Sequence, residues 1–174
     1  MQEFVNPDLL RNGIFDLLSS VNLATEQNTE LLNYTIDLFN ENGLSSDYYG
    51  YHNIDHELEV TYVTLMSAIH SLNEKKFVLD DVKYLFASAL LHDFDPRKAS
   101  DRPHEKSVID FINKDEKIQQ LLQDAMIDSN IICALILRTV YPWTGEVKSK
   151  TEEEIKNYLI SSSHTRGDTE KQDH

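Results

Sequence analysis

The sequence is poor in residues that build disulfides, tight turns or membrane spans. Its 174 residues include one Cys, four Pro and five Gly. Cys133 alone can form neither an intrachain disulfide nor a cysteine-rich zinc site. With so little Pro and Gly and 40% apolar residues, a disordered chain and a turn-rich β fold are both disfavoured.

Export and membrane signals are also missing from the sequence. No apolar run reaches the roughly 18 residues that a membrane span needs. The start, Met1-Gln2-Glu3-Phe4, has neither the basic region nor the apolar segment of a signal peptide. We therefore expect a cytoplasmic protein that does not enter a membrane.

Basic residues are scarce as well, with 16 Lys and Arg against 30 Asp and Glu and a formal net charge of −14. An acidic chain repels nucleic-acid backbones and anionic membrane surfaces, so binding to either is not expected. A small phosphorylated substrate remains compatible with this charge. Bound metal and a few local Lys or Arg side chains can reverse the field inside one pocket.

Apolar residues recur at three- and four-residue spacing along most of the chain, and no segment alternates in the way that strands do. This pattern predicts a single all-α domain over residues 1–160, followed by a polar tail over 161–174. The tail is either a solvated end or the cut end of a longer chain. Helices are expected from Pro7, over about 29–40, over about 52–72, from Asp80 or Asp81, after Pro103, from a cap at Ser129, and from a capping box that begins at Thr151.

Two short motifs carry the chemistry. His52 and His56 stand four residues apart at the start of the third expected helix, where that spacing would place both imidazoles on one face. We expect Val60 and Val63 to continue this face into the buried side of the helix. His92 and Asp93 follow an apolar helix that Pro96 must stop. Three imidazoles and a carboxylate are a common ligand set for a divalent metal ion.

The motifs His52-Asn53-x-x-His56 and Leu91-His92-Asp93 together resemble those of the HD-domain metal-dependent phosphohydrolase superfamily. The first motif is most similar to the form found in cyclic nucleotide phosphodiesterases, and the resemblance covers roughly residues 48–142. It implies an HD-domain helical bundle in which His56, His92 and Asp93 bind one or two divalent ions. It also implies His52 as a catalytic general acid toward the leaving oxygen. The ligand set does not distinguish Mn, Mg, Zn, Fe, Ni and Co.

The same resemblance points to further residues after the second motif. His104 is a candidate for a second metal or a phosphate, and Lys106 and Arg97 are candidate phosphate contacts. The expected reaction is hydrolysis of a phosphoester in a small phosphorylated metabolite, a nucleotide or cyclic nucleotide. One departure from the family stands out, because no aspartate in an apolar helical context follows Asp128. The last metal ligand would then lie beyond residue 174 or be Asp168 in the polar tail.

Two other classes of function fit parts of the sequence. A catalytically silent helical module that senses a ligand or mediates assembly would account for the missing late aspartate. A di-iron oxygenase would use related ligands, but it needs further histidines at paired spacing, and His104 is the only candidate found.

Overall fold

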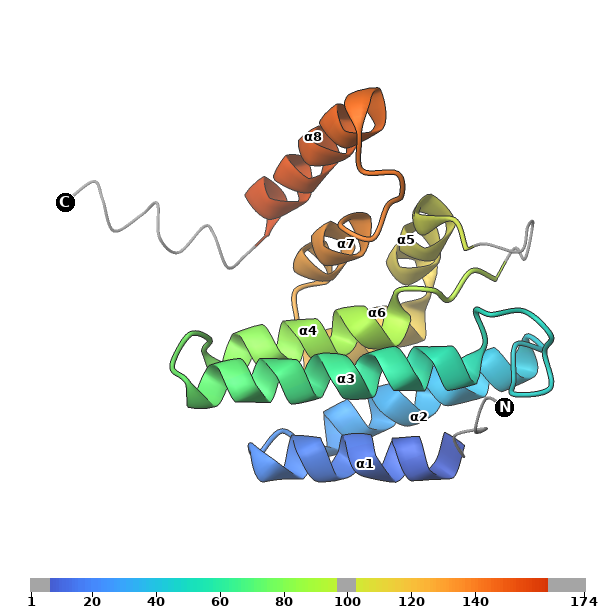
Figure 1. Ribbon diagram of the computed structural model, residues 1–174, viewed down its shortest axis with the longest axis vertical. Coiled ribbons are helices and arrows are strands. Elements are labelled where there is room, and N and C mark those ends of the chain that lie inside the picture. Colours follow the sequence, from blue (N-terminus) through green and yellow to red (C-terminus); the bar gives the residue numbers. More distant parts are fainter. Residues whose placement is uncertain (1–6, 97–102, 163–174) are drawn as a thin grey trace.

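The computed structural model describes residues 7–96 and 103–162, and these residues form helices with no strand among them (Figure 1). The prediction of an all-α helical bundle is confirmed for this part of the chain. The helices are α1 (Pro7–Ser20), α2 (Glu26–Glu41), α3 (Ile54–Asn73), α4 (Leu79–Leu91), α5 (Glu105–Lys114), α6 (Glu116–Asp124), α7 (Ser129–Leu137) and α8 (Gly145–Ser161).

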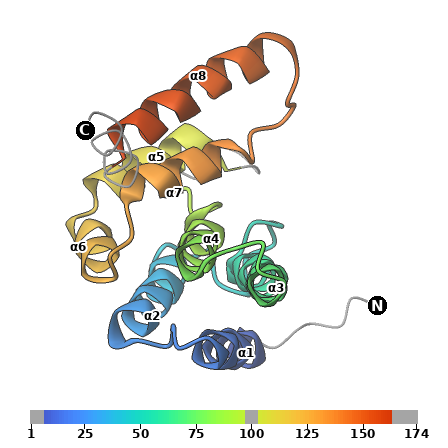
Figure 2. The ribbon, with the colours of Figure 1, turned by 90° about the vertical axis from the view of Figure 1, so that its left-hand side faces the viewer.

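Helices α3 and α4 form an antiparallel pair at the centre of the molecule. Helix α1 packs on α3, whereas α7 packs on the opposite partner, α4. Figure 2 shows α8 on the outside of α7, at the end of the molecule away from α1. Because α3 and α4 run in opposite directions, the start of α3 lies beside the end of α4, and both motifs come to this end of the pair.

Helix α3 begins two residues later than the sequence predicts. Asn53 is its N-cap, with extended backbone (φ −117°, ψ 179°), and its side-chain oxygen accepts a hydrogen bond from the backbone N–H of His56 at 3.1 Å. Asparagine satisfies a free N–H of the first turn, which explains why the helix starts here. His52 therefore precedes the helix, and the prediction that His52 and His56 stack on one helical face is wrong.

Other local predictions in the second half of the chain fail for similar reasons. Thr151 does not begin a capping box, because it lies within α8 and is buried. Asp128, rather than Ser129, is the N-cap of α7, since its carboxylate accepts the backbone N–H of Asn130 at 2.9 Å. The polar stretch after α5 also forms a helix, α6, which begins at its own N-cap, Asp115.

The buried apolar side chains of α1 to α7 form one connected cluster. Leu58 and Leu65 of α3 belong to it, as predicted. Val63 is 56% exposed, so the stripe expected to continue from the histidines does not merge into the core. Within the described ranges no single helix has the length and hydropathy to cross a membrane. Helices α6 and α7 would pass only as a pair, and they are bent by 109° at the break between them.

Phe94 connects the end of α4 to the core, and its removal should destabilise the fold. Its side chain is buried, and its ring centroid lies 5.2 Å from that of Phe39 and 4.8 Å from that of Phe111. We expect Phe94→Ala to lower the free energy of unfolding by about 3–5 kcal/mol, because it leaves a cavity between three segments. Urea unfolding followed by circular dichroism measures this, with the fully exposed Tyr49→Ala as a control expected within about 0.5 kcal/mol of the parent. A loss below about 1 kcal/mol would contradict the assigned packing.

Candidate metal centre

Five side chains meet where α3 begins and α4 ends, and we call them the Asp93 cluster. His52 precedes α3, His56 and Glu57 lie in its first turns, His92 is the C-cap of α4, and Asp93 follows it. All four residues expected from the motifs are thus brought together. Because His92 sits at the helix end, it and the adjacent Asp93 can turn their side chains toward the same point.

Three imidazole nitrogens converge on one oxygen, Oδ2 of Asp93. The distances are 2.6 Å from His52 Nδ1, 3.2 Å from His56 Nε2 and 3.2 Å from His92 Nε2. The side chains of His56, His92 and Asp93 are largely buried, whereas that of His52 is about one quarter exposed. The side chains of the three predicted metal ligands therefore lie in the interior of the cluster, and the imidazole of His52 lies at its edge.

The distances to Asp93 Oδ2 distinguish residues that could share a metal ion with Asp93 from a residue that is hydrogen-bonded to it. Two ligand atoms held about 2.1 Å from one ion, at angles between about 90° and 109°, lie about 3.0–3.4 Å apart. The separations of His56 Nε2 and His92 Nε2 from Asp93 Oδ2 fall in that interval. The His52 contact is shorter and has the length of a charge-assisted hydrogen bond, in which His52 Nδ1–H donates to the carboxylate.

The ring of His92 is oriented by the backbone. Its Nδ1 lies 2.7 Å from the carbonyl oxygen of Ala89, and since a carbonyl can only accept, Nδ1 carries the proton and donates it. The Nε2 atom is then left facing Asp93. Metal-binding histidines are commonly held in this way, with one ring nitrogen donating to a backbone carbonyl or carboxylate.

Glu57 is the member of the cluster that sequence analysis missed. Its side chain is fully buried, and its Oε1 lies 3.3 Å from His92 Nδ1. Among the described residues no group donates a well-aligned hydrogen bond to either carboxylate oxygen. The signal was present in the helical spacing, because position 57 stands three residues after Ile54 and four before Thr61, on the buried face of α3.

Burial and mutual attraction shift the ionisation of this cluster strongly. Burial opposes the charge on His92, but attraction to Glu57 and the hydrogen bond to Asp93 outweigh it and raise the pKa of the imidazole to about 11. Burial would raise the pKa of Asp93, yet hydrogen bonds from His56 and His92, with the charge on His92, hold it well below its usual range. Burial raises the pKa of Glu57, opposed by the attraction to His92. Without metal, His92 is therefore an imidazolium beside an aspartate.

The ligand atoms fall into two groups that share Asp93. His52, His56 and Asp93 form one, and Glu57, His92 and Asp93 form the other, with ligand atoms within 4.8 Å of one another in each. The predicted ligands His56 and His92 thus fall in different groups, each together with Asp93. Imidazole nitrogens with carboxylate oxygens suit a divalent transition metal, and the buried carboxylate of Glu57, which receives no well-aligned hydrogen bond from the described residues, is consistent with a nearby cation. The residues present fit a metal centre.

Metal binding to this cluster should strengthen as the pH rises. An ion that takes His92 Nε2 as a ligand must displace the proton that this nitrogen holds in the metal-free protein, and the pKa near 11 keeps that proton bound throughout the neutral range. We expect the measured affinity to rise about tenfold per pH unit for each proton displaced, between about pH 6 and pH 9. Competition titrations of Zn²⁺ against a chromophoric chelator, corrected for the chelator's own protonation, measure this. An affinity independent of pH would contradict the proton displacement.

Tyr51 covers the outer side of the cluster. Its ring centroid lies 4.2 Å from that of His56 and 5.1 Å from that of His52, while its side chain is 70% exposed. Tyr51 is thus placed beside the histidines, and most of its ring remains exposed.

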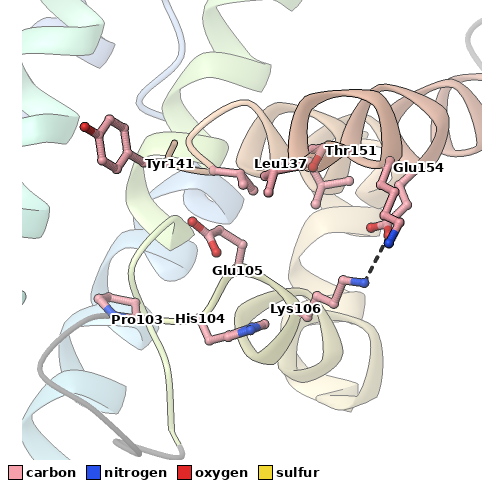
Figure 3. A pocket seen from close by; sticks show the side chains of 11 residues that line it. Pro103, His104, Glu105, Lys106, Leu137, Tyr141, Thr151 and Glu154 are labelled. Carbon is pink, nitrogen blue, oxygen red and sulfur yellow. Dashed lines mark hydrogen bonds and ion pairs between the residues drawn. The ribbon is translucent and has the colours of Figure 1, made fainter. Parts of the chain in front are cut away.

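The remaining predicted site residues lie elsewhere. His104 and Lys106 line a pocket of about 410 Å³ between the start of α5, the end of α7 and α8, and no member of the Asp93 cluster lines it (Figure 3). Within this pocket Lys106 forms an ion pair with Glu154 at 3.0 Å. Their proposed contact with phosphate or a second metal stays a prediction. Arg97 and Asp168 lie outside the described residues.

Asp95 fixes the position of His104 through a backbone hydrogen bond. The Oδ2 atom of Asp95 accepts the backbone N–H of His104 at 3.0 Å, and Oδ1 accepts the hydroxyl of Ser107 at 2.6 Å. This buried carboxylate, two residues after Asp93, therefore fixes the start of α5 against the end of α4. The segment after the second motif has a structural role that its sequence did not reveal.

In comparisons with known proteins, no family model, no curated protein and no solved structure matches this chain. The resemblance to the HD-domain superfamily therefore rests on the two sequence motifs alone and stays a prediction.

Proposed function

We propose that the chain carries the metal centre of an HD-type, metal-dependent phosphohydrolase that cleaves a phosphoester in a small phosphorylated metabolite, a nucleotide or cyclic nucleotide. The observation that carries the proposal is the convergence of three imidazole nitrogens on Asp93 Oδ2 from two separate segments. The two ligand groups that share Asp93 further support a centre of one or two ions.

In this proposal His56, His92 and Asp93 hold the metal. A divalent ion bound there would supply Lewis-acid stabilisation of phosphoryl oxygens and activation of water. Asp93 also orients His52, because accepting the Nδ1–H leaves the opposite nitrogen, Nε2, free to carry a proton. With its side chain at the edge of the cluster, His52 can deliver that proton to the leaving alkoxide.

The surroundings favour a small substrate. The exposed ring of Tyr51 beside His56 could stack on a nucleobase. Stacking of a base on an aromatic ring stabilises binding, and every base can stack in this way. The net charge of −14 disfavours a nucleic-acid polymer, whose many phosphates would meet the whole acidic surface. The di-iron alternative gains no support, because His104 belongs to neither ligand group among the described residues.

Metal content tests the proposal directly. We expect one or two transition-metal ions per chain by plasma mass spectrometry after loading with Mn²⁺ or Zn²⁺, and loss of most of that metal in His92→Ala. His70→Ala is the matched control, because His70 is exposed near the far end of α3 and should leave the metal unchanged. Metal-loaded protein is then assayed with nucleoside monophosphates and cyclic nucleotides.

The metal content and the hydrolysis assay together distinguish the candidate functions. Metal that depends on His92, together with hydrolysis, supports the phosphohydrolase. Metal that depends on His92 without hydrolysis of any phosphoester favours the silent binding module. Equal metal content in the parent and His92→Ala would overturn the proposed centre.

A further inference from the structure

Glu57 belongs to one of the two ligand groups, but it is not among the three residues proposed to hold the metal. We infer that Glu57 is a positioning residue for the metal centre, whose negative charge holds the His92 imidazole with Nε2 directed at the ion. This inference rests on the proposed metal-binding function. It adds a residue of α3 to a centre whose family pattern would look for a late aspartate instead.

Glu57 is fully buried, and neither of its oxygens receives a well-aligned hydrogen bond from the described residues. A buried carboxylate whose only ion-pair partner in the described residues is one imidazole costs folding free energy, and natural proteins keep such groups where they face a cation or a functional group. Its neighbours on the same face of α3 are Ile54, Leu58 and Thr61, so an apolar side chain would suit the packing better.

The carboxylate of Glu57 is directed at the His92 ring. Oε1 lies 3.3 Å from His92 Nδ1, on the side of the ring opposite the nitrogen that faces Asp93. The Nδ1–H donates to the carbonyl of Ala89 at 2.7 Å, so Glu57 acts on the ring as an adjacent negative charge rather than as its main hydrogen-bond acceptor. Carboxylate, imidazole and ion would then lie in sequence, an arrangement that strengthens metal binding in other centres.

Glu57 also changes the net charge of the residues around the proposed ion. His56 and His92 bind an ion as neutral ligands, so Asp93 would be the only negative ligand in the predicted set. A second carboxylate close behind His92 brings the local charge to −2, which balances one divalent ion. A divalent ion would therefore be balanced by two carboxylates, Asp93 in direct contact and Glu57 behind the His92 ring.

The test uses Glu57→Gln, which keeps the size of the side chain and removes its charge. We expect Zn²⁺ and Co²⁺ to bind about 10–100-fold more weakly than to the parent. The metal-free variant should unfold at about the same temperature as the metal-free parent, because Asp93 still faces the His92 ring and the side chain keeps its size. Glu59→Gln, an exposed glutamate two residues further along α3, should change neither quantity.

Each result decides the inference. Unchanged metal affinity in Glu57→Gln overturns it, as does a lower melting temperature of the metal-free variant with a parallel loss of affinity, which would mark a structural role. A change in the visible Co²⁺ spectrum that indicates one fewer ligand would make Glu57 a direct ligand and also overturn it. If the parent and His92→Ala bind metal equally poorly, the proposed function itself fails and the inference falls with it.

Discussion

The Asp93→Asn variant is expected to lose its metal and its hydrolytic activity together. Oδ2 of Asp93 is the one atom to which all three imidazoles of the cluster direct a nitrogen, and both ligand groups include this residue. An amide keeps the size of the side chain but removes the negative charge that attracts the ion. Losing about 4 kcal/mol of transition-state stabilisation corresponds to about a 10³-fold slower reaction, and we expect at least that.

Measurement of metal per chain and of phosphoester hydrolysis on the same samples checks this prediction. Asp47→Asn is the matched control, since Asp47 is an exposed aspartate in the loop that leads to the first motif. Circular dichroism must show that the variant remains helical, because Asp93 also compensates the charge on His92. A folded Asp93→Asn protein that keeps its metal would contradict the central role given to this carboxylate.

The composition and the apolar spacing were sufficient to predict the all-α fold, and the two motifs were sufficient to predict that His52, His56, His92 and Asp93 come together. The first motif stands at the start of α3 and the second at the end of α4, and the antiparallel packing of the two helices brings both motifs to one end of the pair. The sequence predicted each helix but not their pairing. His52 was nevertheless assigned to the wrong element. A helical repeat predicts which residues share a face, but the start of a helix depends on which residue best satisfies free N–H groups, and here that residue is Asn53.

Glu57 shows a different limit. The helical spacing places Glu57 on the buried face of α3, but a glutamate beside apolar residues is usually solvated, and the spacing does not identify the residues that cover it. Its burial depends on tertiary packing, because α4 runs back along α3 and brings His92 against Glu57. The capping box expected at Thr151 failed for the same kind of reason, since α8 begins earlier and packs Thr151 inward.

The His52→Gln variant should keep its metal and lose turnover. His52 contacts Asp93 at hydrogen-bond length rather than at the spacing of two ligands on one ion, so the ion does not depend on it. General acid catalysis contributes about 10²–10⁴-fold, and we expect kcat to fall by that factor on a nucleotide whose leaving alkoxide needs a proton. Metal content should match that of the parent, and a loss of metal would instead make His52 a ligand.

The leaving group distinguishes proton donation from other functions of His52. A p-nitrophenolate leaving group is stable without a proton, so His52→Gln should slow hydrolysis of a p-nitrophenyl phosphoester far less than that of a nucleotide. Tyr51→Phe serves as a control, because it keeps the ring that lies against His52 and His56 and should affect both substrates alike. If His52→Gln slows both substrates equally while the metal stays bound, His52 positions the substrate or the aspartate, and the proton comes from another group.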